Sequence, residues 1–125
     1  MVDIESPVKV DKPWGHEIIF AHTDRYVGKV LHIDRGCLLS RQYHEVKDET
    51  LYVLDGEVIV EIGPSETVER TRVKAGFGFR VVPGTIHRFI APDDQDCDLL
   101  ECSTSELDDV VRVEDVYGRE GTSDP

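Results

Sequence analysis

The chain has 125 residues, the size of one ordinary domain, and a net charge of −12 from 26 acidic and 14 basic residues. This acidity disfavours nucleic acids and anionic membranes as partners, because both bind basic surfaces. Three cysteines without a CxxC pair argue against a disulfide framework. Together with the lack of a signal peptide and of an apolar run near roughly 20 residues, they predict a cytoplasmic protein.

Short strands separated by turn residues dominate the chain between Arg25 and Leu107, and helical periodicity is almost absent. Their number and spacing predict an all-β fold, either a sandwich or a small barrel. The expected strands cover residues 27–33, 38–44, 49–54, 58–62, 68–73, 79–82, 85–90 and 97–102.

Several local signals refine this outline. Asp55-Gly56 predicts a type I′ hairpin between strands 49–54 and 58–62. The alternating charges of 68–73 predict an exposed edge strand, and Ser105 predicts the N-cap of a helical turn over 105–110. We expect an N-terminal arm over residues 1–12, one domain over 13–118 and a flexible tail over 119–125.

One group of polar residues has the spacing of a metal site. Gln42 and His44 are two residues apart on an expected strand, so both side chains lie on one face. Glu49 opens the next strand and can come alongside His44. His87 follows the Pro83-Gly84 turn, which places its imidazole near a barrel mouth. The four side chains make a ligand set for a divalent cation.

These residues resemble the cupin signature. Gly36, Gln42, His44, Glu49 and Gly56 have the spacing of the first cupin motif, with glutamine in place of its first histidine. The second motif is matched by Gly76, Pro83, Gly84 and His87, with Val82 in place of a proline and without the final asparagine. The resemblance implies a double-stranded β-helix, or jelly-roll β-barrel, that pairs as a homodimer.

The glutamine narrows the resemblance to phosphomannose isomerases, whose metal is held by Gln, His, Glu and His. Residues 12–17 (KPWGHE) and 108–119 resemble the start and end of the cupin domain in bifunctional mannose-phosphate isomerase/guanylyltransferase proteins. This resemblance implies that Gln42, His44, Glu49 and His87 hold Zn²⁺, Mn²⁺, Fe²⁺ or Ni²⁺.

Two cations are candidate catalytic residues. Lys29 shares a strand face with the apolar residues Val27, Leu31 and Ile33, so it either reaches the barrel rim or enters a pocket. Lysine and arginine occur at the places of Lys29 and Arg88 in the isomerase-like relatives. Strict strand alternation, however, points Arg88 away from His87.

Three functions fit these residues. The first is a metal-dependent aldose–ketose isomerase acting on a sugar or sugar phosphate such as mannose 6-phosphate. The second is a non-haem metal oxygenase, because two histidines and a carboxylate form the ligand triad of that class. The third is a non-catalytic cupin that binds a metal and a sugar. The sequence singles out no general base.

Overall fold

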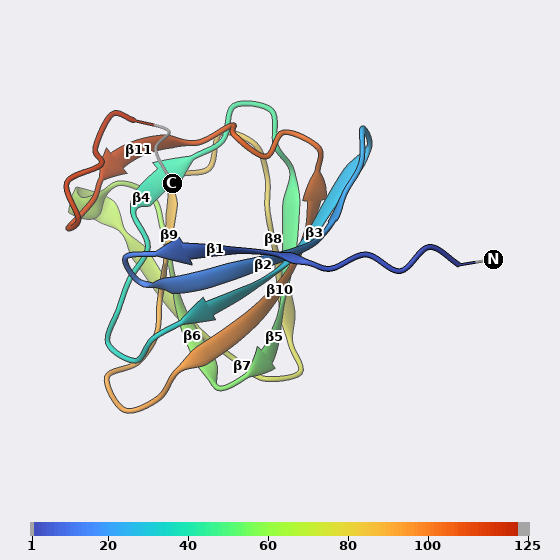
Figure 1. Cartoon of the computed structure of the whole chain (residues 1–125). Coiled ribbons are helices and arrows are strands. Elements are labelled where there is room, and N and C mark those ends of the chain that lie inside the picture. Colours follow the sequence, from blue (N-terminus) through green and yellow to red (C-terminus); the bar gives the residue numbers. More distant parts are fainter. Residues whose placement is uncertain (1, 123–125) are drawn as a thin grey trace.

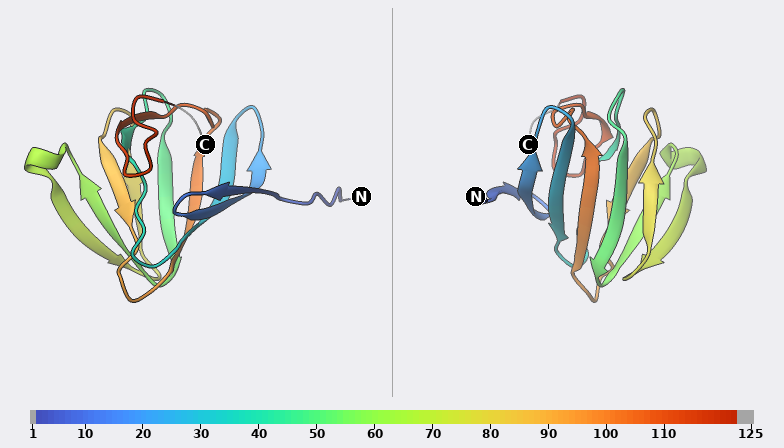
Figure 2. Two further views of the ribbon diagram at one scale, coloured as in Figure 1. Left: turned by 60° about the vertical axis from the view of Figure 1, so that its left-hand side comes forward. Right: turned by 90° about the vertical axis from the view of Figure 1, so that its right-hand side faces the viewer.

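The computed structural model describes residues 2–122, and all its sheets are antiparallel. One sheet has six strands in the order β1-β2-β3-β10-β5-β8, and the other has five in the order β11-β4-β9-β6-β7. The two sheets face each other across the interior (Figures 1 and 2). This arrangement confirms the predicted all-β jelly roll.

The bounds of the strands follow the chain order of Figure 1. They are β1 (Val8–Lys12), β2 (Gly15–His22), β3 (Tyr26–Ile33), β4 (Arg41–Tyr43), β5 (Glu49–Asp55), β6 (Glu57–Ile62), β7 (Glu69–Lys74), β8 (Gly78–Val81), β9 (His87–Ile90), β10 (Cys97–Thr104) and β11 (Val111–Glu114). Within residues 2–122 the helical part is one 3₁₀ turn, η1 (Ser65–Thr67). That part of the chain has no helix with the length and apolarity to cross a membrane.

The side chains that face the interior change from apolar to charged along the strands. On β3 the inward residues run from Ile33 and Leu31 to Lys29, and on β10 they run from Leu99 to Glu101. The β3–β10 register pairs Leu31 with Leu99 and Lys29 with Glu101. Apolar residues therefore lie beside apolar residues, and charged residues lie beside charged residues. On β5 the same change leads from Val53 and Leu51 to Glu49. One end of the barrel is therefore an apolar core, and the other end is lined by charged side chains.

The predicted hairpin at Asp55-Gly56 is wrong. β5 pairs with β10 and β8, whereas β6 pairs with β9 and β7 in the other sheet. Of the two predicted turn residues, Gly56 has a positive φ, of 78°, and Asp55 does not. Gly56 turns the chain from one sheet into the other. A Cβ on Gly56 would collide with the Asp96 carbonyl oxygen, so the glycine also permits a close backbone approach.

Other boundaries also differ from the sequence prediction. Residues 105–110 form turns and no helix, although Leu107 N–H does donate back to the Ser105 carbonyl over 2.8 Å. β2 was not predicted, and β1 occupies part of the expected arm, so residues 2–7 alone extend away from the barrel (Figure 1). The edge position predicted for 68–73 is confirmed by β7.

The C-terminal end of the chain also differs from the flexible tail predicted over residues 119–125. Arg119 and Thr122 fold back, and the Thr122 carbonyl accepts a hydrogen bond from Arg112. The rest of the predicted flexible tail, residues 123–125, lies outside the described residues.

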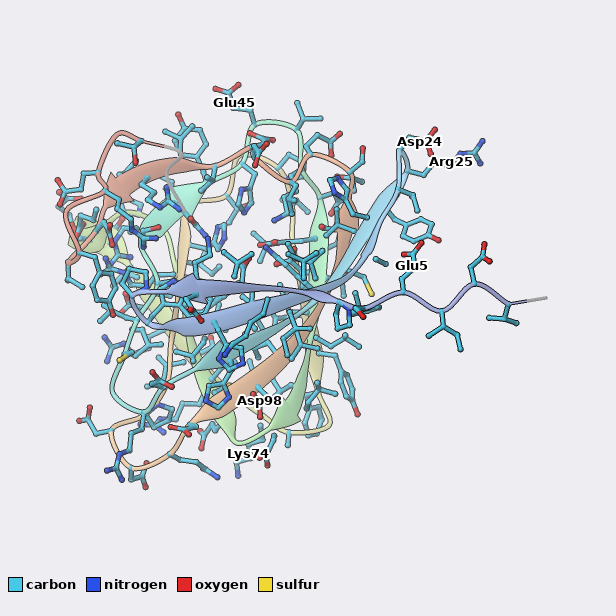
Figure 3. The ribbon with its side chains drawn as sticks, viewed as in Figure 1. Glu5, Asp24, Arg25, Glu45, Lys74 and Asp98 are labelled. Atoms are coloured by element: carbon cyan, nitrogen blue, oxygen red, sulfur yellow. The ribbon has the colours of Figure 1, made fainter. Side chains whose placement is uncertain are left out.

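The loops at the barrel ends carry exposed charges. Asp24 and Arg25 lie at the tip of the β2–β3 hairpin, and Glu45 lies on the connection between β4 and β5 (Figure 3). All three side chains are exposed to solvent.

Candidate metal centre and pocket

Three of the four predicted ligands converge inside the barrel. Glu49 Oε1 lies 3.4 Å from His44 Nε2 and 3.4 Å from His87 Nε2. The three ligand atoms all lie within 4.8 Å of one another, and all three residues are buried. His44 follows β4 and His87 begins β9 in one sheet, while Glu49 begins β5 in the other. The carboxylate therefore reaches the imidazoles across the barrel interior, and not as a hairpin neighbour.

Both imidazoles are fixed by backbone carbonyls. His44 Nδ1 lies 2.6 Å from the Asp109 carbonyl oxygen, and His87 Nδ1 lies 2.8 Å from that of Thr85. A carbonyl can only accept, so each Nδ1 carries a proton, and a neutral ring held in this way presents its lone pair at Nε2. Both Nε2 atoms are buried without a hydrogen-bond partner among the described residues. Two such nitrogens beside a carboxylate oxygen suit a divalent cation, because ligating histidines usually donate their other N–H in this way.

Gln42 lies next to this group but is engaged elsewhere. It pairs with His87 across β4 and β9, and it lines the same pocket as His44. Its Oε1 accepts a hydrogen bond from Ser40 Oγ over 3.0 Å. An amide oxygen has two lone pairs, so this bond leaves one for a cation. Its role as a ligand stays a prediction.

A chain of buried charges of alternating sign extends from Glu49. Lys47 Nζ lies 3.2 Å from Glu49 Oε2 and 3.1 Å from Glu101 Oε2. Lys29 Nζ lies 3.8 Å from the same oxygen of Glu101 and 3.0 Å from Glu17 Oε1. These five side chains are all nearly inaccessible to water. Each charge has an opposite neighbour, as a buried charge requires.

The pKa values follow from these contacts. Burial opposes the charged form of Glu49, but its neighbours, among them the Lys47 ammonium at 3.2 Å, hold its pKa well below the usual range. Burial also opposes the charge of Lys47, yet Glu101 and Glu49 raise its pKa. Burial, followed by the neighbouring Glu49 charge, raises the pKa of Glu101.

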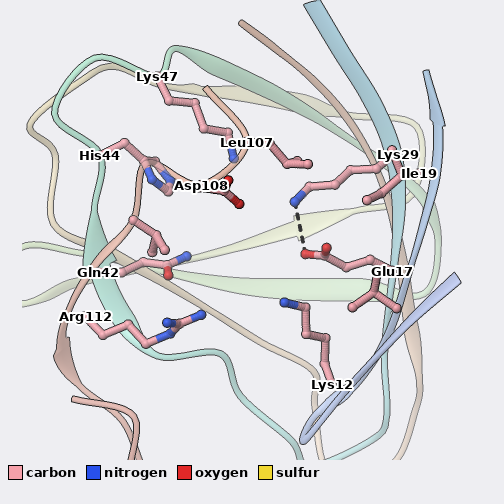
Figure 4. A pocket seen from close by; sticks show the side chains of 12 residues that line it. Lys12, Glu17, Ile19, Lys29, Gln42, His44, Lys47, Leu107, Asp108 and Arg112 are labelled. Carbon is pink, nitrogen blue, oxygen red and sulfur yellow. Dashed lines mark hydrogen bonds and ion pairs between the residues drawn. The ribbon is translucent and has the colours of Figure 1, made fainter. Parts of the chain in front are cut away.

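A cavity of about 190 Å³ opens beside the candidate metal ligands and is lined by Gln42 and His44. Four cations line it, in a protein with a strongly negative total charge: Lys12, Lys29, Lys47 and Arg112. Figure 4 shows them around the hollow, with Glu17 and Asp108 as its carboxylates. A pocket of this kind suits a small, polar and anionic ligand.

The two predicted catalytic cations have different surroundings. Lys29 enters the pocket, where Figure 4 shows its ion pair with Glu17. Arg88 is not among the lining residues. Its Nε donates to the Leu39 carbonyl over 2.9 Å and its Nη2 to the Glu114 carbonyl over 3.3 Å. Arg88 thus connects backbone segments, as strand alternation indicated.

Sequence reasoning missed Glu17, Lys47 and Asp109. Glu17 lies on the unpredicted strand β2, and Lys47 was assigned to a polar connection. The Asp109 carboxylate accepts hydrogen bonds from the backbone N–H groups of Glu45, Val46 and Lys47, at 3.1, 2.8 and 2.9 Å. The only signal for Asp109 was its place in the acidic run before β11.

A second cluster of potential ligands lies near the opposite end of β3. His32 Nε2 lies 3.4 Å from Asp34 and 3.5 Å from Asp96, and His32 Nδ1 lies 2.6 Å from Asp98 Oδ1. The aspartates are exposed or half-exposed, and the His16 ring stacks on His32. This cluster is explained as a surface ion-pair group around one imidazole.

The chain belongs to the cupin family: the family model described as "Cupin domain" matches residues 29–102. The chain is 30% identical over 114 residues to the xanthan biosynthesis protein XanB of Xanthomonas campestris pv. campestris (strain B100). That match covers 89% of this chain and 24% of XanB, so the chain spans about a quarter of its curated relative.

Solved structures share the fold. KdgF from Halomonas sp. has a TM-score of 0.70 at 26% identity, covering 82% of this chain and 89% of KdgF. The capsular polysaccharide assembling protein CapF from Staphylococcus aureus has a TM-score of 0.73 at 18% identity, covering 87% of this chain and 34% of CapF. An oxalate oxidase has a TM-score of 0.62 at 20% identity, covering 70% of this chain and 46% of the enzyme.

Proposed function

We propose that this cupin is a divalent-metal-dependent aldose–ketose isomerase, with a sugar phosphate such as mannose 6-phosphate as its substrate. One observation carries the proposal: two unpartnered imidazole nitrogens and a carboxylate oxygen converge beside a pocket that contains both cations and acids. The likeness to XanB, named for the biosynthesis of a polysaccharide, supports a carbohydrate substrate.

Gln42, His44, Glu49 and His87 would hold the cation, which is Zn²⁺, Mn²⁺, Fe²⁺ or Ni²⁺ by the chemistry of these donors. When bound, such an ion stabilises negative charge on a substrate oxygen as a Lewis acid. The carbonyls of Asp109 and Thr85 keep the two Nε2 lone pairs directed at it.

Isomerisation moves one proton between two adjacent carbons of the sugar. We assign its transfer to Glu17, the buried carboxylate of the pocket. Glu17 accepts the proton from the hydroxyl-bearing carbon next to the carbonyl and returns it to the former carbonyl carbon, while the hydroxyl proton passes to the former carbonyl oxygen, so Glu17 ends the cycle as it began. Lys29 holds the carboxylate from 3.0 Å and can donate to a sugar oxygen. Arg88 has no role in this reaction, because its guanidinium binds backbone carbonyls.

Metal content and turnover test the proposal together. We expect one metal per chain and conversion of mannose 6-phosphate that is lost with EDTA and restored by metal. Glu17→Gln should keep the metal and lose at least about 100-fold in turnover. Glu45→Gln, on the exposed connection after β4, is the matched control.

Other outcomes point to the alternative functions. Full metal occupancy without turnover on free or phosphorylated sugars would contradict an isomerase and favour a binding cupin. Oxygen consumption that depends on iron would contradict it in favour of an oxygenase.

We further propose that the chain forms a homodimer through the edge of the six-stranded sheet. β1 leaves one side of its backbone unpaired within that sheet, and the extended residues 2–7 lead into it. Light scattering of the full chain and of a chain that begins at Val8 measures the oligomeric state. A full chain that is a monomer at all concentrations would contradict a homodimer.

A further inference from the structure

A smaller recess adjoins the pocket beside the metal ligands. Its volume is about 40 Å³. Four of its lining residues also line the larger pocket: Lys12, Glu17, Gln42 and Arg112. The recess adds Trp14, Leu39, Ser40 and Arg119. Three of the charged groups in the recess are cations, and its one carboxylate, Glu17, is already bound by Lys29.

Lys12 is a cation without a counterion. It ends β1 and is half-buried, and its ammonium group forms no hydrogen bond or ion pair with the described residues. Burial lowers its pKa, the charge of Glu17 opposes this, and the nearby cations Lys29, Arg112 and Arg119 lower it further. A partly buried ammonium among other cations is stabilised by an incoming anion.

Arg119 has a spare donor group in the same recess. Its Nε and Nη2 donate to Asp115 over 2.7 and 3.3 Å, and its side chain is 11% exposed. Its Nη1 is buried and has no acceptor within the described chain. A buried donor without an acceptor is costly, and an oxyanion would satisfy it. Arg112 adds a third positive charge to the recess. Its Nη1 donates a hydrogen bond to the Thr122 carbonyl over 3.1 Å.

We infer that Lys12, Arg112 and Arg119 form a subsite for the phosphate group of a phosphorylated sugar. The inference rests on the proposed function and specifies how its substrate is held. The phosphate lies in the recess, and the sugar extends past Gln42 towards His44 in the larger pocket. Because the chain as a whole repels anions, this local group of cations selects the phosphorylated form.

Calorimetric titration with inorganic phosphate, mannose 6-phosphate and free mannose tests the subsite. The full chain is used both with metal and after EDTA treatment, so that phosphate bound to the metal is separated from phosphate bound to the recess. Lys12→Met keeps the apolar stem and removes the charge. Lys9→Met is the matched control, because Lys9 lies on the same strand but is exposed, 3.8 Å from Asp11.

We expect saturable phosphate binding in the metal-free chain, weakened about 10- to 100-fold by Lys12→Met and unchanged by Lys9→Met. Free mannose should bind both variants equally. Equal phosphate affinity in the wild type and Lys12→Met, or phosphate binding only in the metal-loaded chain, would overturn the subsite.

The results also separate the subsite from the isomerase. Lys12-dependent phosphate binding in a chain without turnover supports the subsite and contradicts the enzyme. Turnover of mannose 6-phosphate with an unchanged KM in Lys12→Met supports the enzyme and contradicts the subsite.

Discussion

His44 and Asp109 lie 65 residues apart in the chain, yet His44 Nδ1 donates to the Asp109 carbonyl oxygen over 2.6 Å. The Asp109 side chain meanwhile holds the N–H groups of residues 45–47. One residue thus fixes both the ring that presents Nε2 and the loop that carries Lys47.

The first prediction concerns this support. Asp109→Ala frees the 45–47 loop and the carbonyl that orients His44, so the metal dissociation constant should rise about 10- to 100-fold. Competition with a fluorescent zinc chelator measures it. Asp24→Ala, at the exposed tip of the β2–β3 hairpin, should leave metal affinity within about threefold of the wild type. Equal effects of the two substitutions would contradict the role of Asp109.

The second prediction concerns the ligands. His44→Ala and His87→Ala each remove a buried Nε2, so the metal content of the purified protein should fall from one per chain to near zero. Inductively coupled plasma mass spectrometry gives the content. His22→Ala, at an exposed end of β2, is the control. Full occupancy in either site variant would rule out the centre described above.

The third prediction concerns a buried ion pair outside the pocket. Arg41 Nη2 donates to Glu61 Oε1 over 2.9 Å, and both side chains are buried. Glu61→Gln should lower the free energy of unfolding by about 2–3 kcal/mol, because Arg41 then loses its buried counterion while keeping Glu114. Glu57→Gln, on the same strand with the exposed Arg72 as partner, should cost less than about 1 kcal/mol. Urea denaturation measures the free energy of unfolding of both variants. Equal losses of stability would contradict the claim that the buried ion pair contributes more than the exposed one.

The fourth prediction contrasts two glycines with similar backbone angles. Gly56 has φ 78° and no space for a Cβ, whereas Gly76 has φ 92° and open space around it. Gly76→Ala should cost about 1–2 kcal/mol of backbone strain. Gly56→Ala adds a collision with the Asp96 backbone and should cost about 3 kcal/mol or more, or prevent folding. Melting temperatures give the order, and a Gly76→Ala chain less stable than Gly56→Ala would refute it.

The fifth prediction is a pH dependence. The hydrogen bond that His32 Nδ1 donates to the Asp98 carboxylate raises the pKa of His32 against the effect of burial, and the charges of Asp96 and Asp34 add to it. The folded state therefore prefers the protonated ring. This contribution is complete below the unfolded pKa of about 6.5 and is lost as the pH rises through the higher folded pKa.

Urea denaturation at pH 6 and pH 9 checks this dependence. The stability difference between the wild type and His32→Gln should shrink by up to about 1 kcal/mol between these values, a small change because the group lies near water. His22→Gln should show a constant difference. A larger advantage of the wild type at pH 9 would contradict the assigned direction.

The sequence predicted the ligands better than the way in which they meet. The spacing of His44, Glu49 and His87 with the motif glycines was sufficient to predict that these three side chains meet, because the turns fix where each strand starts. It was not sufficient for the pairing of β5 and β6, since a glycine with positive φ serves a hairpin and a change of sheet equally well.

The charged wall of the pocket was harder to predict. Lys29 was found because it interrupts an apolar face, but Glu17 and Lys12 gave no such signal. Both belong to the first two strands, where most residues are exposed or half-buried and periodicity is weak. Their meeting with Arg112 and Arg119 depends on the return of the chain end to the same side of the barrel, which no local pattern encodes.

The change from Leu31, Leu51 and Leu99 to Lys29, Glu49 and Glu101 along neighbouring strands has an evolutionary consequence. The three leucines do not line the pocket, whereas Lys29 lines it and Glu49 and Glu101 are the partners of Lys47, which also lines it. New specificities can therefore arise at the charged end by exchanging a few residues, while the leucine end continues to specify the same architecture.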